Sequence, residues 1–114
     1  MAPVKTTPVS NVGAQDYEPY IHEGKPFGKV HWLRTESGGE GVLLTGLWAH
    51  DVGEKPRYVF PGDETVHVLE GEATLVVEGE TVTLRPGDIA SFTKGQSADW
   101  TITQPFKEFF VISG

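Results

Sequence analysis

The sequence contains no cysteine among its 114 residues and no long hydrophobic run. The absence of cysteine excludes disulfides, Fe–S clusters, cysteine-ligated zinc and thiol nucleophiles, and it gives no sign of an oxidising compartment. No apolar run approaches the ~18 residues that a transmembrane helix needs. Residues 1–10 also lack the apolar segment of a signal peptide. We therefore expect a cytoplasmic protein that has no membrane partner.

Basic residues are also scarce. The chain has 9 Lys and Arg against 16 Asp and Glu, which gives a formal net charge of −7. The few basic residues are scattered along the sequence, so they form no positive stripe that could neutralise phosphates. We expect no nucleic-acid partner.

Turn-forming residues are abundant instead, with 14 Gly and 8 Pro. The hydrophobic fraction of 38% is too high for a disordered chain. The length fits a single domain. From residue 28 onward, short apolar segments alternate with turn signals, which is typical of an all-β sandwich or barrel, and no window shows a helical stripe. The predicted strands cover residues 29–34, 42–50, 57–60, 64–69, 73–77, 81–84, 89–92, 99–103 and 108–112.

The N-terminal part lacks the alternation of strands and turns, because its prolines lie among Thr, Ser, Asn and Gly without periodicity. We interpret residues 1–27 as an extended arm and residues 28–114 as the single folded domain. The arm either lies across a neighbouring surface through its apolar and aromatic side chains or is a mobile tail.

Two motifs resemble the cupin superfamily. The first is DETVHVLEGE, which begins at Asp63, and the second is LRPGD, which begins at Leu84. Together with GLW at residues 46–48 and PFKEFFVI at residues 105–112, they resemble the branch of small single-domain cupins of ureidoglycine aminohydrolase type. The resemblance covers about two thirds of the chain. It implies a jelly-roll β-barrel of two antiparallel sheets with its site in the barrel mouth.

Metal-binding cupins carry three histidines and one glutamate at fixed spacing within two motifs, and here only the glutamate remains. Glu64 and Gly71 fit the end of the first motif, but Phe60 and Tyr58 occupy its two histidine positions. In the second motif, Ala98 occupies the histidine position. One carboxylate does not make a transition-metal site. We predict no metal and no other cofactor, the alternative being a rebuilt site that uses His50.

The resemblance also indicates which residues face the barrel interior. Glu64 is the one carboxyl there, and we predict that it acts as an acid or base with Tyr58 or His50 as its partner. Apolar neighbours would disfavour the charged form of Glu64, so its pKa should rise. The predicted ligand-binding residues are Trp48, Phe60, Val66, Ala98 and Trp100. The structural alternatives are that both tryptophans are barrel core and that Glu64 pairs with Arg57.

Several functions therefore stay open. The first is a metal-independent cupin that binds, and in one version transforms, a small molecule in the barrel. The second is a metal-dependent aminohydrolase resembling ureidoglycine aminohydrolase. The third is a metal-free isomerase, lyase or cyclase that uses Glu64, because cupins host many chemistries. A purely structural or dimerisation role is the fourth. Small cupins form dimers through their N-terminal strands, so the resemblance also implies a homodimer.

Overall fold

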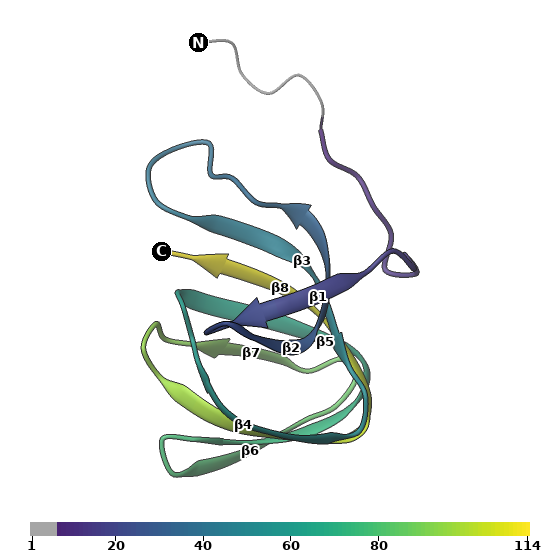
Figure 1. The fold of residues 1–114 in the computed structure, drawn as a ribbon, viewed down its shortest axis with the longest axis vertical. Helices are drawn as coiled ribbons and strands as arrows, with labels where there is room; N and C mark the ends of the chain where they lie inside the picture. Colours follow the sequence, from purple (N-terminus) through teal and green to yellow (C-terminus); the bar gives the residue numbers. More distant parts are fainter. Residues whose placement is uncertain (1–6) are drawn as a thin grey trace.

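The computed structural model of the chain describes residues 7–114, which form strands, turns and irregular segments (Figure 1). The described residues contain no helix, and hence none that is long and apolar enough to cross a membrane. All strand pairs are antiparallel, and the predicted all-β fold is confirmed. The strands are β1 (Glu18–His22), β2 (Lys25–Arg34), β3 (Leu43–His50), β4 (Gly53–Val59), β5 (Asp63–Val77), β6 (Glu80–Leu84), β7 (Ile89–Phe92) and β8 (Ser97–Ser113).

Two strands are longer than the sequence predicts: β5 has 15 residues and β8 has 17. Each of them joins two predicted strands, because the residues between these runs bend the strand without ending it. The pairing register between β5 and β8 shifts three times between Val68 and Ala73. Gly71 lies in this bend with a φ of 80°, and a Cβ added there would lie 2.0 Å from the backbone oxygen of Pro105. The bend therefore requires a residue without a side chain.

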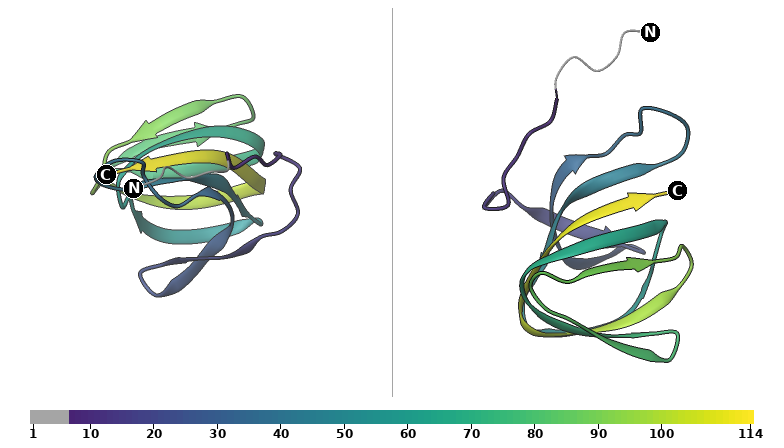
Figure 2. Two further views of the ribbon diagram at one scale, coloured as in Figure 1. Left: turned by 90° about the horizontal axis from the view of Figure 1, so that it is seen from above. Right: turned by 180° about the vertical axis from the view of Figure 1, so that it is seen from behind.

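The bends in β5 and β8 divide the barrel into two layers. The first part of β5 and the last part of β8 pair with each other, and they lie between β7 on one side and β3, β2 and β1 on the other. The remaining parts of β5 and β8 pair with β6 and β4, respectively. The layers curve around a common interior (Figures 1 and 2). This arrangement is the cupin jelly-roll that the sequence resemblance implies.

Strand pairing begins within the predicted N-terminal arm. β1 pairs with β2, and β2 starts at Lys25, so residues 18–27 belong to the sheet. These residues are ordered by backbone pairing, which a sequence without clear periodicity does not reveal. Residues 7–17 form no strand, although the Ser10 hydroxyl lies 2.7 Å from Nε2 of His31. Residues 1–6 of the predicted arm lie outside the described residues.

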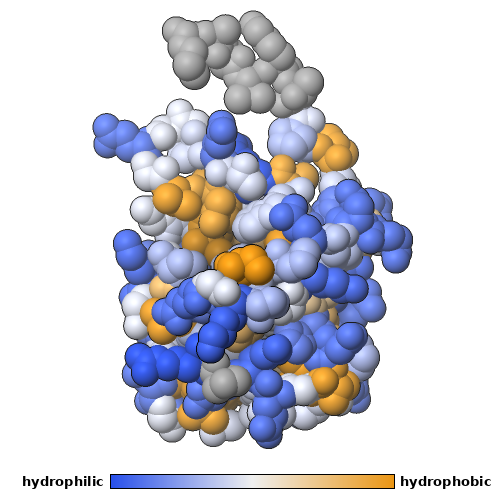
Figure 3. All heavy atoms as spheres, in the orientation of Figure 1, coloured by the Kyte–Doolittle hydropathy of each residue, from blue (hydrophilic) through white to orange (hydrophobic). Residues whose placement is uncertain are grey.

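The barrel interior is strongly aromatic and almost free of charge. Alternate residues of β5 and β8 point inward, as expected from the period of two in a strand. Only two charged or polar side chains in the described part of the chain are buried, Glu64 at 5% exposure and Glu108 at 2%. The face shown in Figure 3 is mostly hydrophilic, with hydrophobic side chains visible in a hollow near its upper part. Two of the 16 acidic residues therefore differ in environment from a solvated surface charge.

Candidate functional site

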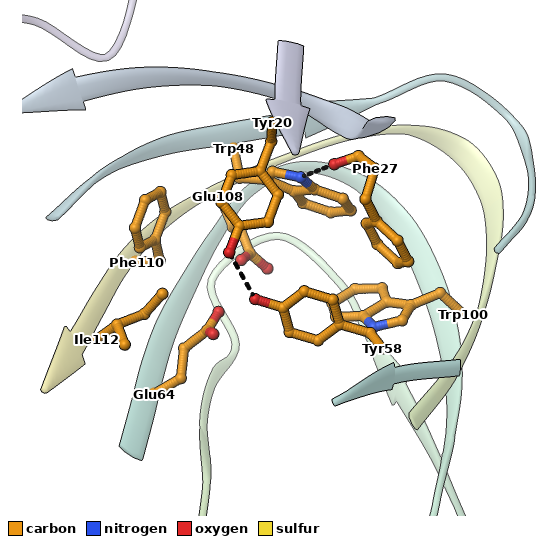
Figure 4. A pocket seen from close by; sticks show the side chains of 9 residues that line it. All are labelled: Tyr20, Phe27, Trp48, Tyr58, Glu64, Trp100, Glu108, Phe110 and Ile112. Atoms are coloured by element: carbon orange, nitrogen blue, oxygen red, sulfur yellow. Dashed lines mark hydrogen bonds between the residues drawn. The ribbon is translucent and has the colours of Figure 1, made fainter. Parts of the chain in front are cut away.

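A pocket opens into the barrel interior between β1 and the bent strands β5 and β8. Its walls are mainly aromatic, and two carboxyl groups and two tyrosine hydroxyls meet inside it (Figure 4). The centre of a water molecule can occupy about 20 Å³ of this pocket, which is enough space for about one water. The lining residues are Tyr20, Phe27, Trp48, Tyr58, Glu64, Trp100, Glu108, Phe110 and Ile112.

The two carboxyl groups come from neighbouring strands. Glu64 lies on β5 opposite Ile112 of β8, and Glu108 lies on β8 opposite Val68 of β5. Both positions share the inward parity of their strands, so both side chains enter the barrel. Figure 4 shows the two carboxyl groups directed toward the space beside the Tyr58 hydroxyl. The bent antiparallel pair thus brings together two acids that are 44 positions apart in the sequence.

Burial makes both glutamates unusual acids. It raises the pKa of Glu64 to about 8, and the nearby Tyr58 hydroxyl offsets part of this rise. Burial also raises the pKa of Glu108 well above its ordinary value, and the adjacent charge of Glu64 raises it further. One carboxyl oxygen of each residue, Oε1, is buried without a hydrogen-bond partner. No Lys, Arg or His lines the pocket, so nothing in its described walls neutralises an ionised pair.

Tyr58 and Tyr20 close the pocket from the side of β1. Their hydroxyl oxygens are 3.0 Å apart and share a hydrogen bond (Figure 4). Burial raises the pKa of both phenols, so both remain protonated and can donate. His22, also on β1, packs against Tyr58 at 4.2 Å between ring centroids and accepts a hydrogen bond of 3.3 Å from the Val59 N–H. β1 therefore covers the pocket while pairing with β2 at the edge of the sheet.

The hydrogen bond between Tyr20 and Tyr58 predicts that removing the Tyr20 hydroxyl lowers the stability of the fold. Tyr20→Phe should lower the free energy of unfolding by about 1 kcal/mol, because it deletes the hydrogen bond to Tyr58. Tyr17→Phe is the matched control, since the buried Tyr17 hydroxyl has no partner. Urea unfolding followed by circular dichroism measures both. Equal effects of the two substitutions would mean that the Tyr20–Tyr58 bond does not hold β1 in place.

The structure brings together four of the predicted site residues. Glu64, Tyr58, Trp48 and Trp100 all line the pocket, and the pKa of Glu64 is raised as its apolar surroundings predict. The two tryptophans also belong to the hydrophobic core, with ring centroids 5.2 Å apart. The same two side chains therefore pack in the core and line the pocket. Arg57 does not pair with Glu64. It is exposed, and its backbone N–H donates to Asp99 Oδ1 at 2.7 Å.

The other predicted site residues lie elsewhere in the barrel. Phe60, Val66 and Ala98 are buried core residues outside the pocket lining. Phe60 stacks on Phe92 at 4.4 Å between ring centroids. His50 also lies outside the lining, where its Nδ1 contacts the backbone oxygen of Asp51.

Sequence reasoning missed two functional candidates, Glu108 and Tyr20. A signal for Glu108 was present, because it alternates with Phe106, Phe110 and Ile112, which are all buried. The predicted strand begins at residue 108, so it leaves out Phe106 and does not show that Glu108 lies between inward-facing residues. No comparable signal marks Tyr20, since its position depends on how β1 pairs with β2.

The pocket does not fit the metal that cupins commonly bind. No group of three His, Asp or Glu side chains is placed to hold an ion anywhere in residues 7–114. The family's ligand positions hold Tyr58, Phe60, Glu64 and Ala98, of which Phe and Ala have no ligating atom. Trp100 lines the pocket with an unpartnered buried N–H, which donates and cannot ligate.

Comparison with known proteins gives a consistent set of matches. A profile of the EutQ-like cupin domain matches residues 37–110. The chain is similar to the ethanolamine utilization protein Q (EutQ) of Salmonella typhimurium LT2, with 26% identity, a TM-score of 0.66, and coverage of 80% of this chain and 72% of that chain. It is also similar to a DUF861 family protein of Thermotoga maritima, with 25% identity, a TM-score of 0.55, and coverage of 58% of this chain and 75% of that chain. The EutQ protein of Clostridium difficile, at 17% identity and a TM-score of 0.66 over 82% of this chain and 74% of that chain, shares the fold. A search of the curated proteins gave no match.

Proposed function

The chain belongs to the EutQ-like cupin domain family, and from this premise we propose that it binds a small molecule in the barrel pocket without a resident transition metal. The observation that carries the proposal is the pair of buried carboxyl groups, Glu64 and Glu108, each with an unpartnered oxygen. Burying such groups costs free energy, because each unmade hydrogen bond carries a desolvation penalty. A core that served only stability would gain from apolar residues at both positions. The pair is therefore best understood as recognition groups for a ligand.

The same pair supports a second candidate function, acid–base chemistry on the bound molecule. A carboxyl whose pKa is about 8 can hold or release a proton near neutral pH, which suits a general acid or base. Tyr58 adds a protonated hydroxyl in the same pocket. This supports the metal-free isomerase, lyase or cyclase alternative, with Glu108 rather than His50 beside Glu64.

The metal-dependent aminohydrolase alternative has less support. Its chemistry needs an ion, and the pocket offers two carboxyl groups and no imidazole. Membership of the ureidoglycine aminohydrolase-type branch stays a prediction from the sequence motifs. The name of the Salmonella relative connects that protein with ethanolamine utilization, which makes small amino alcohols reasonable compounds to test here.

A ligand screen by thermal unfolding tests the proposed function. Small metabolites are tested with the wild type, Glu64→Gln, Glu108→Gln and the control Glu80→Gln, which changes an exposed glutamate on β6. A ligand present at 100 times its Kd should add about 2.7 kcal/mol to the stability of the wild type and of the control. Both pocket variants should lose this gain.

Two results would contradict the proposal. Equal stabilisation of the pocket variants would put the ligand site elsewhere, and a stoichiometric transition metal in the purified protein would remove the metal-free part. For any substrate that is found, Glu64→Gln should lower kcat by about 100-fold or more if Glu64 transfers a proton. Unchanged kcat would remove Glu64 from the chemistry.

We further propose that the protein is a homodimer in which the N-terminal residues contribute to the interface. Residues 7–17 lie outside the strands (Figure 1), and Val9 and Val12 within them are exposed although Ser10 contacts His31 of β2. Light scattering would contradict this proposal by giving the mass of a single chain, 12.4 kDa.

A further inference from the structure

We propose that the ligand of this pocket carries a protonated amine, which lies between the carboxyl groups of Glu64 and Glu108 and against the surrounding aromatic rings. The inference rests on the proposed function, because it names the class of molecule that the same pocket binds. It predicts a small organic cation rather than a neutral or anionic compound.

The hydrogen-bonding groups of the pocket match an ammonium group. Such a group brings three N–H donors and needs three acceptors. Glu64 Oε1 and Glu108 Oε1 are both buried and without a partner, and the Tyr58 hydroxyl oxygen faces the same space (Figure 4). An anionic ligand would meet two acids and no Lys, Arg or His in the lining. The two carboxyl groups therefore favour a cationic ligand over an anionic one.

The aromatic walls provide a second attraction for a cation. The rings of Trp48 and Trp100 lie 5.2 Å apart at an angle of 57°, and Phe27 lies 5.8 Å from Trp48. Figure 4 shows these rings on the side of the pocket that faces the carboxyl groups. A positive charge is attracted to the face of an aromatic ring, and most strongly when water is excluded. A neutral alcohol of the same shape would gain little from this surface.

The space for the amine is small. The open volume of about 20 Å³ accepts a group the size of a water molecule or an ammonium, so the carbon chain of the ligand lies toward the pocket mouth. Tyr20 lies on β1, which among the described strands pairs with β2 at the edge of the sheet. The unpartnered N–H of Trp100 offers a donor for an acceptor group on the ligand, such as a hydroxyl. Small amino alcohols have this combination.

Binding of a cation should release protons from the pocket. A carboxyl accepts hydrogen bonds from an ammonium when it is ionised, and the pKa of Glu64 is about 8. The titratable groups that face it are Glu108 from β8, Tyr58 from β4 and Tyr20 from β1, and both phenols stay protonated. The ionised fraction of Glu64 rises from about a tenth at pH 7 to about a half at pH 8, so the affinity for an amine should increase about fivefold over this range.

Isothermal titration calorimetry with three probes of matched shape tests the inference. Ethanolamine, ethylene glycol and glycolate share a two-carbon hydroxy skeleton and differ in charge. We expect ethanolamine to bind most tightly, with about tenfold or greater loss in Glu64→Gln and Glu108→Gln and none in the exposed control Glu80→Gln. Proton release is measured on the wild type by repeating the titration in two buffers of different ionisation enthalpy, so that the test does not depend on how the variants fold.

The possible outcomes separate this inference from the proposed function. Equal or tighter binding of ethylene glycol or glycolate would overturn the amine assignment and leave the pocket as a ligand site. Binding of ethanolamine that is unaffected by both substitutions and releases no proton would overturn the site itself. Failure of ethanolamine, ethylammonium and ammonium to bind at pH 8 would overturn the amine assignment, while the metabolite screen would still decide whether the pocket binds another class.

Discussion

At pH 8, the double variant Glu64→Gln/Glu108→Gln should be more stable than the wild type, and at pH 5 the difference should shrink or reverse. The reason is that both carboxyls are buried and have raised pKa values in the folded chain. The folded state holds these protons more tightly than the unfolded state does. Their contribution to stability is therefore complete below the unfolded pKa of about 4.5 and is lost as the pH rises toward the folded pKa.

The expected size of this effect is large. Each carboxyl that stays protonated in the folded state lowers the free energy of unfolding by about 1.4 kcal/mol per pH unit above its unfolded pKa. For Glu64, whose folded pKa is about 8, the loss between pH 5 and pH 8 is on the order of 4 kcal/mol. Glutamine remains neutral at every pH, so the double variant lacks this loss.

Urea unfolding at pH 5, 6.5 and 8 measures the difference between the two proteins. The difference is the informative quantity, because His22 acts in the opposite direction. Burial lowers the pKa of His22, so stability increases as the pH rises through its unfolded value of 6.5. This contribution is present in both proteins and cancels. Parallel stability curves for wild type and double variant would mean that the folded carboxyls are already ionised.

Gly71→Ala should destabilise the fold by roughly 3 kcal/mol or more, because two costs coincide at this position. The φ of 80° is unfavourable for any residue with a Cβ. The added Cβ would also lie 2.0 Å from the Pro105 oxygen and 2.8 Å from the Gln104 oxygen, and both are backbone atoms that cannot rotate away. The bend in β5 would have to move away from β8.

Gly79→Ala separates these two costs. Gly79 has a φ of 83° in the hairpin between β5 and β6, and an added Cβ would meet no atom within 4 Å. This control should therefore lose only about 1 kcal/mol, the cost of the left-handed backbone conformation. Urea unfolding of both variants gives the comparison. Similar losses at the two glycines would show that the close approach of β5 to β8 is not required.

Much of the fold could be predicted from local sequence patterns. Glu78 and Gly79 stand between two predicted strands and form a hairpin turn, because Val77 pairs with Glu80 and both turn residues have positive φ values. Glu64 and Val66, which the family resemblance places in the barrel interior, are two positions apart and both are buried on one face of β5. These features depend on two-residue periodicity and turn chemistry, which are local properties.

Local patterns did not predict that β5 and β8 would each join two of the predicted strands into one. Gly71 and Pro105 look like chain breaks in the sequence, yet each lies within a continuous strand. A glycine ends a strand or bends it depending on the strand that packs opposite, and that partner is 30 or more positions away here. The same limit explains why Glu108 was not recognised as the partner of Glu64.

The sequence by itself determined that this chain is an all-β cupin, that the family's metal-binding histidines are replaced, and that Glu64 faces the barrel. Each conclusion depends on residue types at fixed spacing. Such spacing can be recognised in the sequence without knowing which distant residues contact each other. Only the tertiary structure decided which residues share the pocket with Glu64. The bent pairing of β5 with β8 brings in Glu108, and the pairing of β1 with β2 brings in Tyr20. The burial that raises the pKa of the two carboxyls exists only after these long-range pairings have formed.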